Sequence, residues 1–143
     1  MKQRSGPPAD APDTSVVVAA LSAWHPDHEA ARLFLAKGPA GLAHVVTETF
    51  SVLTRLPHPR RISSPIALAA IRRAFPRRLV SLPPTKIFPL FERLAGAGIQ
   101  GGAVYDAIVA ETARLSGLRL VSLDERAQST YRAVGVDVGW LIE

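Results

Sequence analysis

The chain has 143 residues, of which 48% are hydrophobic and 20% are charged, and it contains no cysteine. This length and composition are typical of one globular domain, and the lack of cysteine excludes disulfides and thiolate metal sites. No apolar run approaches the roughly 18 residues of a membrane helix, and the start of the chain, MKQRSGPPADAPD, lacks the hydrophobic segment of a secretory signal. We therefore expect a soluble, cytoplasmic protein that does not bind membranes.

The first segment, residues 1–12, is rich in proline, glycine and polar residues, and we expect a poorly ordered tail or an irregular first strand there. A single domain over residues 13–143 follows. The apolar run SVVVAALSA at residues 15–23 suits a strand or a helix. Spacing and capping residues then predict a helix over 27–37, a strand over 41–46, a helix capped by Thr47, a helix from Ser64 to about Phe75 and a strand over 78–82.

The second half of the chain has clearer periodicity. The segment AVYDAIVAETARL at residues 103–115 has strongly helical spacing, and LRLVSL at residues 118–123 is the clearest strand pattern. The other elements expected in this half are a helix over 85–94, a helix over about 125–133 and a last strand near 136–141. Strands that alternate with helices predict an α/β domain, with a mostly parallel central sheet of about five strands flanked by helices.

The net charge of +5 is unevenly distributed along the chain. No acidic residue occurs between Thr49 and Phe91. The cations of this stretch are Arg55, Arg60, Arg61, Arg72, Arg73, Arg77, Arg78 and Lys86. Such a segment attracts a polyanion through release of counterions, although a solvated helix face or an acidic partner protein explains it equally well. The seven arginines are our candidates for binding nucleic acid.

A glycine-rich stretch at residues 96–101, GAGIQG, matches the G-x-G-x-x-G fingerprint of dinucleotide-binding folds. Asp124 follows at a suitable distance for a ribose contact. The fingerprint requires a strand before the glycines, whereas the preceding FPLFERLA predicts a helix. Nucleotide binding is therefore the less favoured interpretation, and a helix end followed by a flexible connection is the favoured one.

Four carboxylates lie at the junctions of apolar segments. Asp13 precedes SVVVAAL, Glu48 follows HVV, Asp106 lies in the first turn of a predicted helix, and Asp124 follows LRLVSL. Taken singly, each suits a helix cap or a first-turn acid. Because the carboxyl ends of parallel strands line the ligand crevice of an open sheet, the four would form an acidic pocket if they converge there. Oxygen ligands without cysteine or clustered histidine favour Mg²⁺ or Mn²⁺, which offset the repulsion between carboxylates and activate water against a phosphodiester.

The order of DTSVVVAAL, HPDHEAA, TETFSVLTRL and YDAIVAETARLSGLRLVSLDERA resembles the PIN domain, and specifically the VapC-type toxins of bacterial toxin–antitoxin pairs. The resemblance runs from Asp13 to about the C-terminus. It implies a three-layer α/β domain that acts as a Mg²⁺- or Mn²⁺-dependent endoribonuclease. The residues that match the family's four acids are Asp13, Glu48, Asp106 and Asp124, with Asp13 and Asp106 first in metal binding, and Ser15 and Ser122 stand where the family often has a supporting Thr or Ser.

The resemblance also implies partners, since VapC-type toxins are homodimers inhibited by a VapB-type antitoxin whose tail places a basic side chain in the acidic pocket. It therefore implies an RNA substrate, a cognate antitoxin and a homodimer. One segment departs from the family, in which a hydrophobic central strand precedes the first acid. Here SGPPADAP predicts a short, irregular strand. The alternative function is accordingly a catalytically weakened PIN-like module that binds nucleic acid or protein.

Overall fold

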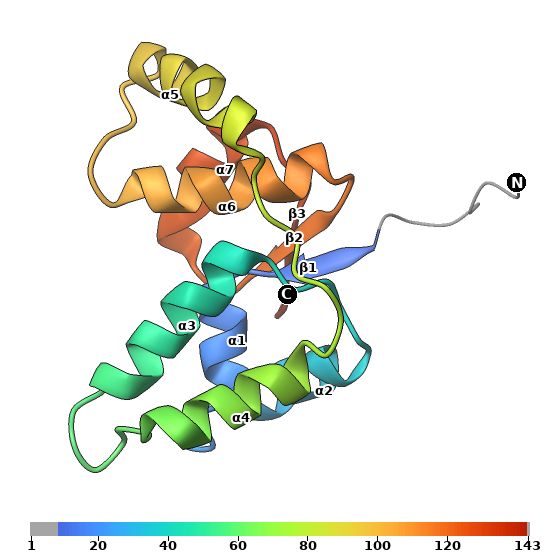
Figure 1. Cartoon of the computed structure of the whole chain (residues 1–143), viewed down its shortest axis with the longest axis vertical. Helices are drawn as coiled ribbons and strands as arrows, with labels where there is room; N and C mark the ends of the chain where they lie inside the picture. Colours follow the sequence, from blue (N-terminus) through green and yellow to red (C-terminus); the bar gives the residue numbers. More distant parts are fainter. Residues whose placement is uncertain (1–8, 143) are drawn as a thin grey trace, which may run out of the picture.

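The computed structural model describes residues 9–142, in which three short strands form one parallel sheet between two groups of helices (Figure 1). The strands are β1 (Asp10–Pro12), β2 (Arg119–Ser122) and β3 (Val138–Trp140). The helices are α1 (Thr14–Ala20), α2 (His28–Ala36), α3 (Ala43–Arg55), α4 (Ser64–Ala74), α5 (Ile87–Gly96), α6 (Ala103–Leu115) and α7 (Gln128–Val134), with short 3-10 turns at Pro84–Lys86 and Glu125–Ala127. This α/β arrangement confirms the predicted fold class. Within the described range, no helix combines the length and apolarity of a membrane span.

The central strand of the sheet is β2, which pairs in parallel with β1 on one side and β3 on the other. Successive side chains of a strand point to opposite faces, and both faces of β2 are covered. Leu120 packs with buried residues of α6 and α7, whereas Val121 packs with buried residues of α1 and α2. Because β1 and β2 run in the same direction, the residues that follow them emerge at one edge of the sheet.

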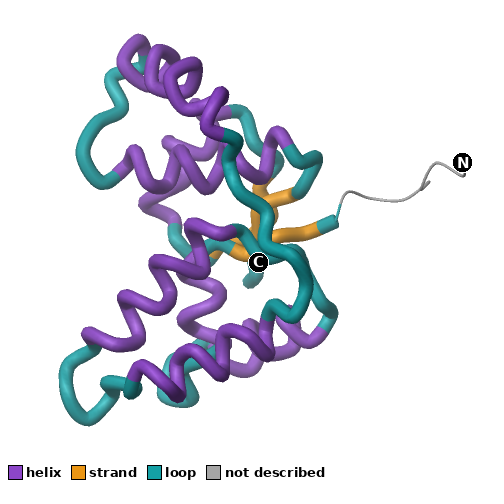
Figure 2. The backbone as a smooth tube through the Cα atoms, viewed as in Figure 1, coloured by secondary structure: helices purple, strands orange, loops and turns teal. Residues whose placement is uncertain are grey.

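Two of the predicted strands, over 41–46 and 78–82, pair with each other only through a single backbone bridge. Leu42 and Val80 form an isolated parallel bridge, and Val80 exchanges backbone hydrogen bonds of 2.8 Å with the residues on either side of Leu42. The orange segments near the centre of Figure 2 are the three short strands β1, β2 and β3. The prediction of strands over 41–46 and 78–82, and with it the number of about five strands, was therefore wrong for the described residues.

The apolar run at residues 41–46 leads into a helix instead of forming a strand. Helix α3 begins at Ala43 and buries one face completely. Three fully buried residues, spaced four apart as on a helix, define that face: Val45, Thr49 and Leu53. Thr47 was predicted to cap this helix, but it lies inside it and its hydroxyl donates to the carbonyl of Ala43 at 2.9 Å. Glu48 consequently lies in the second turn of α3.

The chain passes directly from strand to helix at Asp13. The ambiguous run at residues 15–23 lies mainly in helix α1, which Asp13 caps by accepting a hydrogen bond from the backbone of Val16 at 3.3 Å. The backbone N–H of Asp13 donates to the carbonyl of Val121 at 2.9 Å, so the pairing with β2 continues past the end of β1. Although β1 has only three residues, this pairing fixes the position of Asp13. Of the predicted tail, residues 1–8 lie outside the described residues.

Helix α6 is joined to its neighbours through the buried side chain of Glu111. Arg93 of α5 donates to this carboxylate at 2.7 Å and Arg114 at 2.6 Å, and Arg93 also donates to the carbonyl of Val134 in α7 at 2.8 Å. Burial acts to raise the pKa of Glu111, but the hydrogen bonds and charges of the two arginines hold it below its usual value. The network fixes α6, the helix that carries Asp106, against α5 and α7.

The glycine-rich stretch connects two helices, since α5 ends at Gly96 and α6 begins at Ala103. Gly98 and Gly101 have φ values of 71° and 63°, a backbone region that favours glycine. The element directly before the glycines is helix α5 and not a strand, so the stretch lacks the structural context that binds a pyrophosphate. The glycines serve the turns between α5 and α6.

Candidate active site

Asp13 is buried, with 3% of its surface exposed, and its carboxylate accepts hydrogen bonds from several elements. The hydroxyl of Ser122, at the end of β2, donates at 2.5 Å, and the hydroxyl of Tyr131, in α7, donates at 2.8 Å. The hydroxyl of Ser15, in α1, donates to the other carboxylate oxygen. Burial raises the pKa of Asp13, and these hydrogen bonds act in the opposite direction. Three elements thus hold one carboxylate in a fixed orientation.

The two serines also connect Asp13 to the segment that follows β2. Ser15 Oγ accepts the backbone N–H of Leu123 at 2.9 Å, and Ser122 Oγ accepts the backbone N–H of Asp124 at 2.9 Å. Each hydroxyl therefore donates to Asp13 while it accepts from the backbone beside Asp124. The structure places both predicted supporting serines against the first carboxylate.

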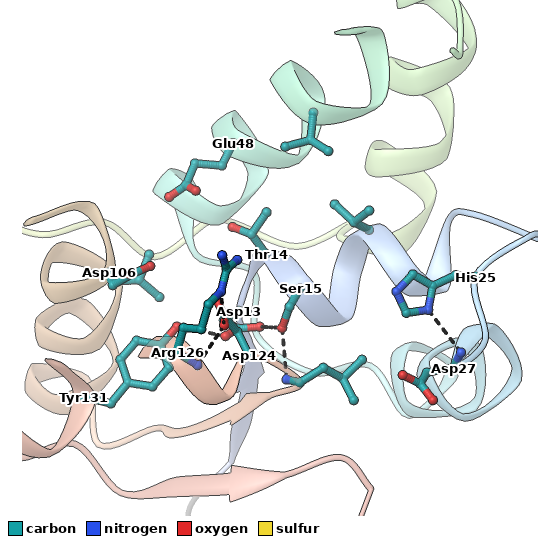
Figure 3. A pocket seen from close by; sticks show the side chains of 14 residues that line it. Asp13, Thr14, Ser15, His25, Asp27, Glu48, Asp106, Asp124, Arg126 and Tyr131 are labelled. Carbon is teal, nitrogen blue, oxygen red and sulfur yellow. Dashed lines mark hydrogen bonds and ion pairs between the residues drawn. The ribbon is translucent and has the colours of Figure 1, made fainter. Parts of the chain in front are cut away.

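Asp124 lies two residues beyond β2 and begins the 3-10 turn at Glu125–Ala127. Its carboxylate accepts the backbone N–H of Arg126 at 3.0 Å, and Arg126 Nε lies 3.5 Å from the same oxygen. The Arg126 side chain is 94% exposed, and Figure 3 shows it extending into the space between the carboxylates. A cation of the chain itself thus lies at the acidic site.

Glu48 approaches the same space from α3. Its Oε1 atom lies 2.7 Å from His44 Nε2, one helical turn earlier. This close approach lacks hydrogen-bond geometry, and both buried atoms have no hydrogen-bond partner among the described residues. The His44 ring stacks on the ring of Tyr105 from α6, with centroids 5.5 Å apart and an interplanar angle of 10°. Glu48 therefore has a buried oxygen, beside His44 Nε2, whose missing hydrogen bond a bound cation would replace.

Asp106 lies in the first turn of α6, and of the four candidate acids it is the one whose pKa shows the influence of the other three. Its pKa is raised to about 6, first by burial and then by the negative charges of the other three carboxylates, while the charge of Arg126 acts to lower it. The charges of Glu48 and Asp124 are the larger of these carboxylate effects. This mutual repulsion means that the four acidic side chains share one region.

All four carboxylates line a single pocket of about 510 Å³ (Figure 3). In the view of Figure 3, Glu48 and Asp106 lie towards one end of the pocket, and His25 lies at the other. The structure therefore brings together the acids that the sequence placed at separate junctions. They come from the ends of β1 and β2 and from the N-terminal halves of α3 and α6.

The donor atoms of this pocket suit a hard divalent cation. The acidic ligands are all carboxylate oxygens, one of them buried without a hydrogen bond from any described residue, and they repel one another. Oxygen ligands of this kind favour Mg²⁺ or Mn²⁺ over zinc. As they stand, no three of the described histidines, aspartates and glutamates are close enough to hold an ion together. The residues fit a cation in chemistry and in charge, and binding requires the carboxylates to move closer together.

The seven arginines predicted to bind nucleic acid are all exposed, and none of them lines the acidic pocket. Arg55, Arg60 and Arg61 lie at the end of α3 and in the loop after it. The other four lie in the last turn of α4 and just beyond it: Arg72, Arg73, Arg77 and Arg78. The cation that does line the pocket is Arg126.

Of the charged and aromatic side chains that line the pocket, sequence reasoning did not single out four: His25, Asp27, Arg126 and Tyr131. Arg126 lies two residues after a candidate acid, which is the one local signal among them. Tyr131 is fully buried on α7 and reaches Asp13 across 118 residues of sequence. Contacts of this kind depend on how helices pack, and a single sequence does not encode them in any local pattern.

Comparison with known proteins agrees with this geometry. The PIN domain family matches residues 11–133, a range that includes all four carboxylates. Ribonuclease VapC40 of Mycobacterium tuberculosis, known from two strains, is 41% identical over 128 residues, which make up 90% of this chain and 96% of that protein. Ribonuclease VapC27 of the same species is 39% identical over 133 residues, or 92% of this chain and 96% of that protein. The resemblance is thereby confirmed, and the chain belongs to the PIN domain family as a VapC-type member.

Proposed function

We propose that this protein is a Mg²⁺- or Mn²⁺-dependent endoribonuclease that hydrolyses RNA phosphodiester bonds. The observation that carries the proposal is the convergence of Asp13, Glu48, Asp106 and Asp124 on one pocket. Two relatives that share about two fifths of its residues are named ribonucleases, which supports RNA as the substrate. In this proposal, residues 13–143 form a single catalytic domain.

In this proposal, the four carboxylates have different roles that follow from their surroundings. Asp13 and Asp106 are the first ligands of the cation, and Glu48 and Asp124 complete the site. A bound Mg²⁺ or Mn²⁺ would polarise the phosphate and lower the pKa of a water molecule. Ser15, Ser122 and Tyr131 hold Asp13 in place, so its orientation is set before the cation arrives.

The remaining carboxylates have more freedom to respond to the substrate. Glu48 Oε1 has no hydrogen-bond partner among the described residues, so turning towards a ligand breaks only its close approach to His44 Nε2 at 2.7 Å. Arg126 offsets part of the negative charge of the pocket through its approach to Asp124. The carboxylate nearest the attacking water accepts its proton, as general base catalysis requires.

We further propose that the protein is the toxin of a toxin–antitoxin pair and acts in the cytoplasm. Its family membership supports a homodimer and a cognate VapB-type antitoxin. A basic side chain from an antitoxin would offset the same four negative charges that a metal ion offsets. The acidic pocket is therefore the expected point of inhibition.

The alternative is a catalytically weakened module of the same fold that binds nucleic acid or protein. The observation in its favour is that no three acidic or histidine side chains of residues 9–142 are close enough to hold an ion as they stand. The two functions differ in whether RNA is cut and in whether the cut requires both metal and the carboxylates.

Cleavage of a structured RNA by purified protein in Mg²⁺ or Mn²⁺ tests the proposal. The wild-type protein is expected to cut the RNA, and excess EDTA is expected to stop the reaction. Asp106→Asn keeps the shape of the side chain but removes its charge, so it should slow cleavage by about a hundredfold or more.

Asp137→Asn is the matched control, because Asp137 is an exposed acid outside the pocket and its replacement should leave the rate unchanged. Equal cleavage by the wild type and Asp106→Asn would contradict the proposal, since the reaction would then come from another site or from a contaminant.

A further inference from the structure

Three side chains from two loops form a row that leads away from the acidic pocket. Trp24 and His25 lie in the connection from α1 to α2, and Arg60 lies in the connection from α3 to α4. The Arg60 guanidinium carbon is 4.2 Å from the centroid of the Trp24 ring, and the Trp24 and His25 ring centroids are 5.7 Å apart. His25 lines the acidic pocket at the end away from Asp106 (Figure 3). The row therefore connects the pocket to the outer surface.

The outer part of this row is open to solvent. Trp24 is 41% exposed, and Arg60 is exposed as well. One face of the Arg60 guanidinium packs on the Trp24 indole. The N–H groups of this guanidinium have no hydrogen-bond partner among the described residues. An indole and a planar cation in this arrangement offer a stacking surface together with donors for phosphate oxygens.

His25 adds a donor at the inner end of the row. Its Nδ1 atom accepts the backbone N–H of Asp27 at 3.0 Å. In the neutral ring the proton must then be on Nε2, and no described residue accepts a hydrogen bond from that atom. The ring therefore presents an unused N–H in a pocket that is also lined by five carboxylates, those of Asp27 and the four candidate acids.

Both loops are held in place by backbone hydrogen bonds. The N–H of His25 donates to the carbonyl of Ser22 at 2.9 Å, and the N–H of Arg60 donates to the carbonyl of Pro57 at 2.9 Å. The loop after α3 is also tied to that helix by a bond of 3.0 Å from Ile62 to Leu53. The three side chains therefore start from anchored backbone, which lowers the entropic cost of binding a ligand.

We propose that Trp24, His25 and Arg60 form a subsite for single-stranded RNA beside the bond that is cut. The N–H groups of Arg60 and the Nε2–H of His25 bind phosphate oxygens, and the exposed indole of Trp24 stacks on a nucleobase. This subsite rests on the proposed function for the identity of its ligand. It also supplies the Arg60 cation on the surface beside Trp24 and the His25 donor inside the pocket, near carboxylates that would otherwise repel the RNA backbone.

Fluorescence of Trp24 tests this subsite directly. The chain has two tryptophans, so Trp140→Phe leaves Trp24 as the single emitter. The probe is a single-stranded RNA of about ten nucleotides, added in EDTA so that no metal-dependent cleavage occurs. A stacked base should quench the Trp24 emission in a saturable way. This readout leaves Trp24 itself unchanged, so it does not depend on whether a Trp24 variant folds.

Affinities of variants for the same RNA, measured by anisotropy, test each member of the row. Trp24→Ala and Arg60→Ala should each weaken binding by about tenfold, because a stack or a charge-assisted contact is lost. Arg61→Ala removes the same charge one residue along, from a side chain that donates to the carbonyl of Leu56 at 3.0 Å, and it should weaken binding by a smaller factor than Arg60→Ala, whose side chain stacks on Trp24. In cleavage assays the Trp24 and Arg60 variants should raise KM with little change in kcat, as expected for loss of binding that is equal in the ground and transition states.

The outcomes separate this inference from the proposed function. Unchanged Trp24 emission at saturating RNA, with unchanged affinity of Arg60→Ala, would overturn the subsite even if cleavage depends on Asp106. Conversely, saturable quenching together with weakened binding by Arg60→Ala would support the subsite even in a protein that does not cut RNA.

Discussion

At the scale of single residues, Asp13 shows how the fold maintains a buried carboxylate through hydrogen bonds. Burial alone raises the pKa of this side chain, and the hydroxyls of Ser15, Ser122 and Tyr131 oppose that effect. All three donate to the carboxylate, and two of them come from residues more than 100 positions away in sequence. Their positions therefore couple the geometry of the site to the packing of β2 and α7.

Removal of the Tyr131 hydroxyl tests this coupling. Tyr131→Phe should lower the free energy of unfolding by about 2 kcal/mol, because a buried carboxylate loses a charge-assisted hydrogen bond. Tyr105→Phe is the natural control, since Tyr105 is the other tyrosine of the chain and is 55% exposed. Urea denaturation in EDTA measures both variants, and equal stability of Tyr131→Phe and wild type would argue against a stabilising role for this bond.

Asp106 makes a second prediction, which concerns pH. Its pKa is raised to about 6 in the folded protein, whereas the ordinary value is 3.8, so the folded state binds the proton more tightly than the unfolded state. The stabilisation that this group adds to the folded protein is therefore complete below about pH 4. It is lost as the pH rises through about 6, so the free energy of unfolding falls over that range. Because the carboxylate is half exposed, solvent screening limits the loss to about 1 kcal/mol.

Unfolding experiments in EDTA between pH 4 and 8 should show this loss in the wild type. Asp106→Asn should lack it, so the stability of the variant relative to wild type should increase as the pH rises. A difference between the two proteins that stays constant over this range would contradict the raised pKa.

At the scale of elements, the start of α3 determines where Glu48 lies. The bridge between Leu42 and Val80 ends the extended chain, and α3 begins at the next residue. Gly41 precedes this bridge and packs against the ring of Phe75 from the end of α4. A Cβ atom at position 41 would lie 2.8 Å from Phe75 Cδ1 and 3.0 Å from Leu79 Cδ2, so no side chain fits there without a shift.

Two glycine substitutions should therefore have opposite effects. Gly41→Ala should lower the free energy of unfolding by about 2 kcal/mol, because it overpacks the contact with Phe75. Gly96→Ala lies in helix α5 with open space around the new Cβ, and it should raise the free energy of unfolding by about 0.5 kcal/mol through helix propensity. Thermal or urea denaturation of the pair measures both, and a neutral Gly41→Ala would show that α4 is free to move away.

The elements that the sequence predicted well have strong local signals. The helix over residues 103–115 and the strand that follows it occur almost as expected, because their apolar spacing matches their burial. The prediction of strands over 41–46 and 78–82 was wrong, because a short apolar run suits either a buried strand or the first turn of a buried helix. The carboxylates were found through their places after or before apolar runs, whereas Tyr131 and His25 reach the pocket through tertiary packing that leaves no local pattern.

At the scale of the whole molecule, charge is separated between the pocket and the outer surface. The net charge is +5, yet four carboxylates gather in one pocket, and the seven arginines of the acid-free stretch are exposed outside it. In the proposed function, such a separation would allow the outer surface to attract RNA while the pocket binds metal. Arg60 links the exposed arginines to the acidic pocket, because it packs on Trp24, and Trp24 lies beside His25, which lines the pocket.

Calorimetric titration of Mn²⁺ into metal-free protein near pH 7 tests the central claim most directly. The account predicts saturable binding to the wild type with micromolar to millimolar affinity, and at least tenfold weaker binding to Asp106→Asn but not to Asp137→Asn. Absence of saturable binding, or equal binding by the wild type and Asp106→Asn, would contradict the claim that these four carboxylates form a metal-dependent catalytic site.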